Sequence, residues 1–105
     1  MRNPVRSEFY RFTTKQYGEN GVADFFSLNV SGARQIVISA NNSRTFVTNE
    51  PRVQCIDAGG NLEPDCSIFM IPQNFAVTAL SNDENLNIGI DGAKGTEEVY
   101  VWVIR

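Results

Sequence analysis

Short apolar segments alternate with turn-forming residues along the whole chain. Each apolar segment is rich in β-branched or aromatic residues and is bounded by Gly, Asn, Asp, Ser or Pro, which is typical of strands joined by turns. No stretch has the periodicity of a long amphipathic helix. The pattern predicts strands at about residues 8–14, 24–30, 34–40, 44–48, 52–57, 66–71, 75–80, 86–91 and 97–104.

This spacing, with a turn signal about every ten residues, is typical of sandwiches and small barrels. We therefore expect an all-β fold: a small antiparallel β-sandwich of jelly-roll or immunoglobulin-like type, with eight or nine short strands and little or no helix. A chain of 105 residues is the size of one domain, and no linker divides it. Residues 1–105 are expected to form a single domain, with residues 1–7 as a flexible start or an arm.

Two segments alternate strictly and so predict which side of the strand faces the core. In "FSLNV" (26–30) the first, third and fifth residues are apolar, and in "LNIGID" (86–91) the same positions are apolar while Asn, Gly and Asp occupy the others. Because successive side chains on a strand point to opposite faces, each strand is expected to have one buried and one solvated face.

Two other segments, "CSIFMI" (66–71) and "VYVWVI" (99–104), are apolar on both faces. Either a loop or the N-terminal segment lies over the second face, or that face is a subunit or partner interface. The aromatic residues Phe9, Tyr10 and Phe12 near the N-terminus fit both interpretations. They either complete the domain's own sandwich or contact a neighbour.

The chemical inventory argues against an enzyme. The chain has no histidine, which excludes Ser-His-Asp and Cys-His catalysis and histidine-containing zinc sites. No phosphate-binding glycine motif is present. The carboxylates fall in or beside predicted turns, where such groups are mostly solvated or cap local backbone amides. We expect a non-enzymatic protein without a cofactor.

Charge and hydropathy limit the partners. The net charge is −3, and the nine basic residues are scattered, so no basic stripe is available for nucleic acid. The start of the chain lacks the apolar region of a signal peptide, and no apolar run approaches the length of a membrane span. We expect synthesis in the cytoplasm without a signal peptide and no membrane partner.

Calcium is a candidate ionic ligand, because it takes several oxygen donors from loops. Asp83 and Glu84 lie in the turn "SNDEN", and Asp91 lies in a later turn. No EF-hand pattern supports the assignment. The alternative is that these side chains bind their own turn backbone.

Tyr100 and Trp102 project from the same side of the last predicted strand. Such a pair can pack in the core, form part of a protein interface, or stack against sugar rings. Packing is the favoured interpretation. The sugar-binding one rests on analogy with other small β-sandwiches.

Cys55 and Cys66 flank a glycine-rich turn. A turn at Gly60-Asn61 would set them opposite one another within disulfide reach, whereas a turn at Gly59-Gly60 would set Cys55 opposite Pro64. Pro64 argues against a continuous ladder, and a chain without an export signal keeps its thiols reduced. Buried free thiols are therefore favoured over a disulfide, and a metal site lacks further ligands.

Two functional hypotheses follow. The first is a structural or assembly protein acting through protein–protein surfaces, for example a virion (phage) decoration, capsid-accessory or tail component that forms a homo-oligomer or joins a larger protein assembly. The alternative is a carbohydrate- or receptor-binding module that uses Tyr100 and Trp102. The expected partners are copies of the chain itself, a larger assembly, or a glycan.

Overall fold

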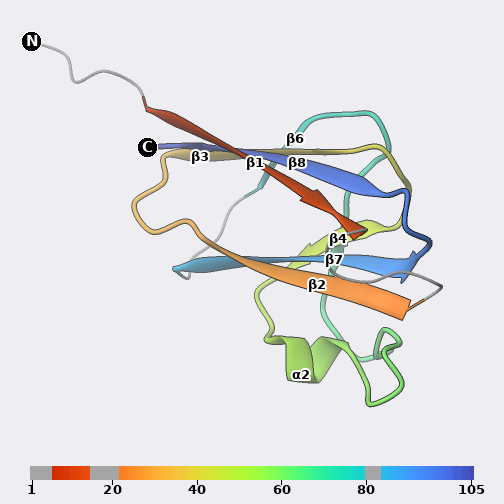
Figure 1. Ribbon diagram of the computed structural model, residues 1–105. Coiled ribbons are helices and arrows are strands. Elements are labelled where there is room, and N and C mark those ends of the chain that lie inside the picture. The colour runs from red at the N-terminus through yellow and green to blue at the C-terminus, as the bar shows by residue number, and fades with distance from the viewer. Residues whose placement is uncertain (1–5, 15–21, 80–83) are drawn as a thin grey trace, which may run out of the picture.

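The fold is an antiparallel β-sandwich of two four-stranded sheets (Figure 1), as the sequence predicts. The computed structural model describes residues 6–14, 22–79 and 84–105. The strand orders are β1-β8-β3-β6 and β2-β7-β4-β5. The strands are β1 (Ser7–Thr13), β2 (Val22–Asn29), β3 (Gln35–Ala40), β4 (Thr45–Thr48), β5 (Phe69–Met70), β6 (Val77–Ala79), β7 (Asn85–Ala93) and β8 (Glu98–Ile104). Residues 1–5 of the expected arm lie outside the described residues, and Ser7 already belongs to β1.

The strand pairing has jelly-roll order. β1 pairs with β8, β2 with β7, β3 with β6 and β4 with β5, so the chain forms a nested set of antiparallel pairs. The outermost pair, β1 with β8, lies in one sheet, the next pair, β2 with β7, lies in the other, and the two inner pairs continue this alternation. Consecutive strands from β1 to β4 therefore lie in opposite sheets. An eight-stranded double sheet of this kind is a jelly roll.

The core lies between the inner faces of the two sheets. The strict alternation of residues 26–30 is confirmed, because the apolar members are buried and Ser27 and Asn29 are exposed. β8 contributes Val99, Val101 and Val103, all completely buried. The core also contains Phe26, Leu28, Val30, Ile36, Ile38, Ala40, Val47, Ile71, Leu86, Ile88, Ile90 and Ala93.

The expectation that β7 has one solvated face is wrong for Asn87 and Gly89, which are both buried. The ring of Phe46, fully buried on the neighbouring strand β4, lies directly over Gly89, its partner in the ladder. Asn87 is held by hydrogen bonds to Ser27 and to the backbone of Glu50. Segments far away in the sequence therefore cover a face of β7 that the local alternation predicts to be solvated.

The cover comes from the connection between β4 and β5. Its buried residues Cys55 and Ile56 pack with Leu62 and Cys66 against Phe25, which projects from the outer face of β2. Figure 1 shows this excursion, with its short helix, on the outer side of the β2-β7-β4-β5 sheet. A second, smaller apolar cluster thus lies outside the sandwich core.

The strand predicted at 52–57 is wrong, and the one at 66–71 is confirmed only at Phe69–Met70. Residues Arg52–Cys55 form a one-turn helix, α2, that begins after Pro51. Pro51 is the N-cap residue, with an extended backbone, and its carbonyl accepts a 3.0 Å hydrogen bond from the Gln54 N–H that closes the turn. The β-branched composition of the segment is outweighed by this local geometry.

The two cysteines form a disulfide, with their Cα atoms 5.0 Å apart, so the preference for free thiols is corrected. Neither turn register considered from the sequence occurs, since Ile56 pairs with Leu62 and the Glu63 N–H donates to the Cys55 carbonyl. The ladder ends at Glu63, before the proline. A second turn, closed by the Cys66 N–H to the Glu63 carbonyl, brings Cys66 back beside Cys55.

Within the described residues, no helix has both the length and the apolar character needed to cross a membrane.

Candidate functional site

Three aromatic side chains gather on the outer face of the β1-β8-β3-β6 sheet. Phe9 pairs with Trp102 in the ladder, and their ring centroids are 5.2 Å apart; Phe9 and Tyr100 stack with their centroids 6.5 Å apart. Phe9 is 53% exposed, and Tyr100 and Trp102 are half-buried. We call Phe9, Tyr100 and Trp102 the aromatic platform.

The structure divides the five aromatic residues singled out from the sequence. Tyr10 and Phe12 point inward and pack against the sandwich core, where Phe12 stacks on Phe26 with centroids 5.0 Å apart. Phe9 points outward because it alternates with them along β1. Strand alternation within "SEFYRF" could have separated Phe9 from its neighbours before the fold was known.

Polar groups border the aromatic platform at one end. The Tyr100 hydroxyl donates a hydrogen bond to one oxygen of Glu98, and Arg11 forms an ion pair with the other. The hydrogen bond to Glu98, together with partial burial, raises the pKa of Tyr100, and the same carboxylate raises the pKa of Arg11. The platform is thus flanked by one positive and one negative side chain.

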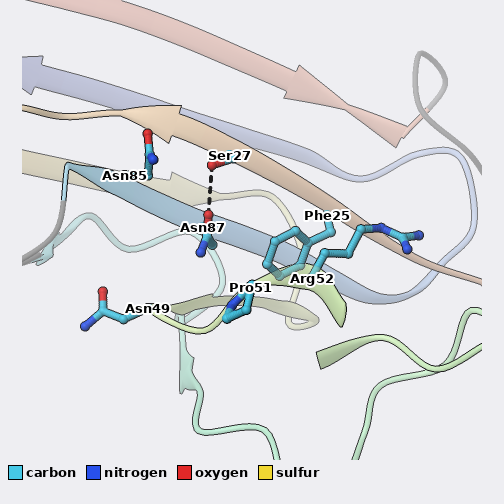
Figure 2. Close-up of a pocket in the computed structure, with 7 residues that line it drawn as sticks. All are labelled: Phe25, Ser27, Asn49, Pro51, Arg52, Asn85 and Asn87. Carbon is cyan, nitrogen blue, oxygen red and sulfur yellow. Dashed lines mark hydrogen bonds between the residues drawn. The ribbon is translucent and has the colours of Figure 1, made fainter. Parts of the chain in front are cut away.

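A pocket of about 520 Å³ opens on the outer face of the other sheet (Figure 2). Asn87 is central to it: its side-chain oxygen accepts a hydrogen bond of 2.9 Å from the Ser27 hydroxyl, and its nitrogen donates one of 2.9 Å to the Glu50 carbonyl. These bonds tie the chain after β4 to the sheet and shape the pocket wall. The described lining residues are Phe25, Ser27, Asn49, Pro51, Arg52, Asn85 and Asn87.

Most residues that line this amide-lined pocket are polar, and they include one cationic side chain, Arg52. Asparagine side chains offer donors and acceptors, and the Phe25 ring offers an apolar face. None of the seven described lining residues carries a carboxylate, so the lining offers no acid–base pair. Sequence reasoning missed this site because its residues come from β2, β7 and the chain after β4, which only the fold brings together.

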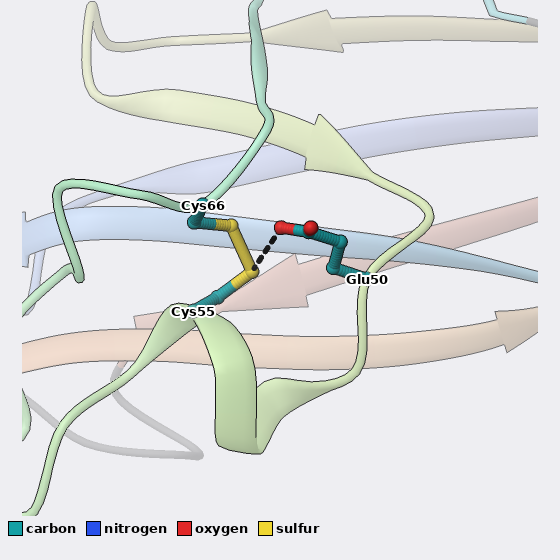
Figure 3. Close-up of side chains that lie close together, drawn as sticks. All are labelled: Glu50, Cys55 and Cys66. Carbon is teal, nitrogen blue, oxygen red and sulfur yellow. Dashed lines mark hydrogen bonds between the residues drawn. A yellow bond between two sulfur atoms is a disulfide. The ribbon is translucent and has the colours of Figure 1, made fainter.

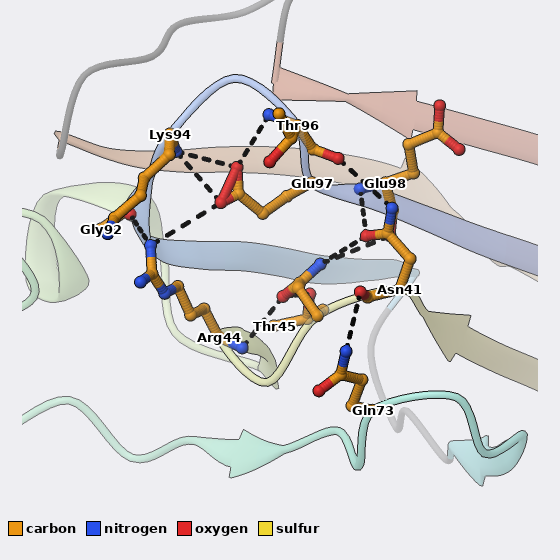
Figure 4. Close-up of polar contacts among 10 residues, drawn as sticks. Asn41, Arg44, Thr45, Gln73, Gly92, Lys94, Thr96, Glu97 and Glu98 are labelled. Atoms are coloured by element: carbon orange, nitrogen blue, oxygen red, sulfur yellow. Dashed lines mark hydrogen bonds and ion pairs between the residues drawn. The ribbon is translucent and has the colours of Figure 1, made fainter.

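Of the two outcomes expected for turn carboxylates, Glu97 shows the second: it is buried, and its carboxylate caps local backbone amides (Figure 4). Its oxygens accept hydrogen bonds from the Lys94 and Thr96 N–H groups and lie 3.8 Å from the Arg44 guanidinium. Burial alone would raise the pKa of Glu97, but these bonds and the Arg44 charge together lower it. Because backbone donors surround Glu97, its role is to order the loop between β7 and β8.

A second buried carboxylate, Asp24, lies on the inner face of β2. Its Oδ2 has no hydrogen-bond partner, and neither has the hydroxyl of the buried Thr14. Burial, followed by the negative charge of Glu97, raises the pKa of Asp24. Ionised Asp24 therefore opposes folding.

The structure does not bring the calcium candidates together. Glu84 precedes β7 and Asp91 lies near its other end, so about 23 Å separates them at 3.3 Å per strand residue. Asp83 lies outside the described residues. One ion cannot bind both Glu84 and Asp91.

A different group of donors does converge (Figure 3). The Glu50 carboxylate and the sulfur atoms of Cys55 and Cys66 all lie within 4.8 Å of one another. Glu50 Oε2 is 3.9 Å from Cys55 Sγ and accepts a hydrogen bond from the Ser67 N–H. Glu50 could not be linked to the cysteines from the sequence, because it lies five residues before Cys55 and outside the turn that the cysteines flank.

Comparisons with family models, with curated proteins and with solved structures find no match for the chain.

Proposed function

We propose that this jelly-roll protein is a non-enzymatic assembly component that contacts copies of itself through the aromatic platform. The observation that carries the proposal is the half-exposed Phe9, which stacks on Tyr100 and lies tilted against Trp102 on the outer face of the sheet. Aromatic residues are enriched at the energetic centres of protein interfaces. The absence of histidine and the engagement of Glu97 in backbone bonds support a role without catalysis.

The size of this face argues for assembly through several contacts. The three long strands β1, β8 and β3 cover about 14 Å by 23 Å, or roughly 330 Å² in projection, at the usual strand spacing and rise. Stable interfaces bury about 800 Å² on each partner. One platform contact is therefore weak, and repetition in a ring or lattice would strengthen it by avidity.

The surroundings of the platform favour a second copy as the partner. Arg11 and Glu98 place both charge signs beside the same aromatic face. A two-fold symmetric contact needs such a self-complementary surface, because each patch meets its own copy. Jelly rolls also build viral capsid subunits, which supports a virion component by analogy of fold alone.

The test is light scattering over a concentration series. Phe9→Ser should lower the association constant about tenfold or more, because loss of an interface aromatic costs about 1.4 kcal/mol or more. Phe75→Ser is the matched control, since Phe75 is also exposed, at 69%, and lies outside the platform. Circular dichroism checks that both variants fold. A monomer at all concentrations, or association that depends on Phe75 and not Phe9, would refute the proposal.

The amide-lined pocket favours carbohydrate binding as a second candidate. Three asparagines and a serine around one phenylalanine ring match the hydroxyl groups and apolar face of a sugar. Saturation-transfer NMR against a set of neutral oligosaccharides tests this function. Binding that Asn85→Ala weakens and Phe9→Ser leaves unchanged would support it, and no binding to any member of the set would count against it.

A further inference from the structure

We infer that the reduced protein binds a thiophilic divalent cation such as Zn²⁺ through Cys55, Cys66 and Glu50. The disulfide and the metal site are alternative states of the same three side chains. Thiolate sulfur and carboxylate oxygen are both ordinary zinc ligands, and a water molecule completes four-coordination. This inference is independent of the proposed assembly function.

The three donors are already close enough. Their ligand atoms lie within 4.8 Å of one another, with 3.9 Å between Glu50 Oε2 and Cys55 Sγ (Figure 3). Two thiolates on one tetrahedral zinc lie about 3.8 Å apart, given Zn–S bonds of about 2.3 Å. Once the sulfur–sulfur bond is broken, the two thiolates must therefore move apart to bind one ion. Side-chain rotation about the Cα–Cβ bonds can supply this movement.

Contacts other than the disulfide hold Glu50 in place. Its carboxylate accepts a 2.8 Å hydrogen bond from the Ser67 N–H, next to Cys66. The Glu50 N–H donates a 3.0 Å hydrogen bond to the Thr48 hydroxyl, and this hydroxyl donates a 2.7 Å hydrogen bond to the Ser67 carbonyl. Thr48 is buried, so this small network joins the chain before α2 to the chain after Cys66. Such outer contacts orient a metal-binding carboxylate.

The cysteines are also held by the backbone. Cys55 is completely buried at the end of α2, and its carbonyl accepts a 2.6 Å hydrogen bond from the Glu63 N–H. The Glu63 carbonyl accepts a 3.2 Å hydrogen bond from the Cys66 N–H. The two thiols therefore stay near Glu50 when the sulfur–sulfur bond is broken.

The chemistry balances with a two-electron reductant. A phosphine gives two electrons to the disulfide, the sulfur–sulfur bond breaks, and each sulfur takes up a proton from water while the phosphine becomes its oxide. Cation binding then releases these two protons, because the ligands are the thiolates. A dication bound to two thiolates and one carboxylate leaves a net charge of −1 at the site.

The experiment is a titration of Cd²⁺, a spectroscopic substitute for Zn²⁺, into protein reduced with a phosphine, which leaves no competing thiol in solution. We expect one cadmium per chain, thiolate-to-cadmium absorption in the ultraviolet, release of two protons per metal, and displacement by Zn²⁺. The oxidised protein should show none of this absorption. Absence of one-to-one binding by the reduced protein would overturn the inference.

Substitution of Glu50 separates a three-donor site from a simple dithiol. Glu50→Gln keeps an acceptor for the Ser67 N–H and should weaken cadmium binding about tenfold or more. Glu63→Gln is the matched control and should bind as the wild type does, because its described contacts use the backbone. Equal affinity of wild type and Glu50→Gln would overturn the site. Thermal unfolding of the oxidised variants checks that they fold. If Glu50→Gln does not fold, Glu50→Asp is used in its place and is also expected to bind cadmium more weakly than the wild type.

Discussion

Substitution of Gly89 by alanine tests the packing on the outer face of β7. An alanine Cβ there would lie 2.1 Å from Phe46 Cζ and 2.6 Å from both Cε atoms, whereas ordinary contacts begin at 3.4 Å. The Phe46 ring is completely buried, so it cannot swing aside without displacing its neighbours. The obstacle is steric alone, because Gly89 does not have the positive φ that restricts Gly92.

We expect Gly89→Ala to destabilise the protein by about 2–3 kcal/mol, the upper part of the range for overpacked cores. At about 4–8 °C per kcal/mol for a domain of this size, the melting temperature falls by roughly 10–20 °C. Phe46→Ala should cost about 3–5 kcal/mol through the cavity it leaves. Urea denaturation followed by Trp102 fluorescence and circular dichroism measures both free energies.

The decisive measurement is the double variant. With the Phe46 ring removed, the alanine methyl at residue 89 enters vacated space, so Gly89→Ala becomes neutral or stabilises by about 0.4–1 kcal/mol. The coupling between the two sites is then about 2–4 kcal/mol. Gly59→Ala, whose Cβ would meet only exposed turn side chains at 3.3 Å and 3.4 Å, should change stability by less than about 0.5 kcal/mol. Additive effects of the two core substitutions would refute the packing argument.

Three further predictions concern the polar contacts. Glu97→Gln should lower the free energy of unfolding by about 1–3 kcal/mol at neutral pH. Because folding lowers the pKa of Glu97, its carboxylate stops stabilising the protein as the pH falls through the folded-state pKa. The free energies of unfolding of variant and wild type, measured with urea, should therefore converge in acid. Asp24→Asn should raise the melting temperature at neutral pH, since the raised pKa of Asp24 shows that folding disfavours its charge, and that gain should vanish once acid protonates the wild-type carboxyl. Arg105→Ala removes hydrogen bonds to Glu8 and to the carbonyls of Asn29 and Ser31, so it should lower the free energy of unfolding by about 1 kcal/mol, measured by urea denaturation. Arg34→Ala is the control, because Arg34 is exposed, and it should cause no measurable change. An equal effect of the two arginine substitutions, or pH-independent effects of the two acidic ones, would contradict these assignments.

Local alternation was enough to predict most of the sandwich. Phe26, Leu28 and Val30 follow the two-residue period of a strand, and the structure buries all three. The helix at Arg52–Cys55 could not be predicted in the same way, because Val53 and the following Ile56 favour a strand, and the one-turn helix is too short to show a helical period. Strand pattern also gave no information on whether jelly-roll or immunoglobulin-like pairing joins the strands.

The site residues were harder to predict, because they depend on segments far apart in the chain. Phe9 and Trp102 meet only when β1 pairs with β8, and Phe46 covers Gly89 only when β4 pairs with β7. Compartment and turn register favour free thiols, but the turn after Glu63 brings Cys66 beside Cys55 and so allows the disulfide. Sequence patterns report which residues face inward and leave open which distant segment lies over the outward face.

The nested strand pairing has a consequence for the order of folding. The β4·β5 pair closes the shortest connection, and each pair outward from it, β3·β6, β2·β7 and β1·β8, adds a longer one. Because closing a long loop costs less entropy once a shorter loop inside it has formed, pairing should spread from the centre of the chain to its ends. β1 then joins last, so substitutions in β1 should speed unfolding more than they slow refolding, which stopped-flow kinetics can measure. Phe9 would be added to Tyr100 and Trp102 only in that last step, so the aromatic platform would be completed only when the fold is complete.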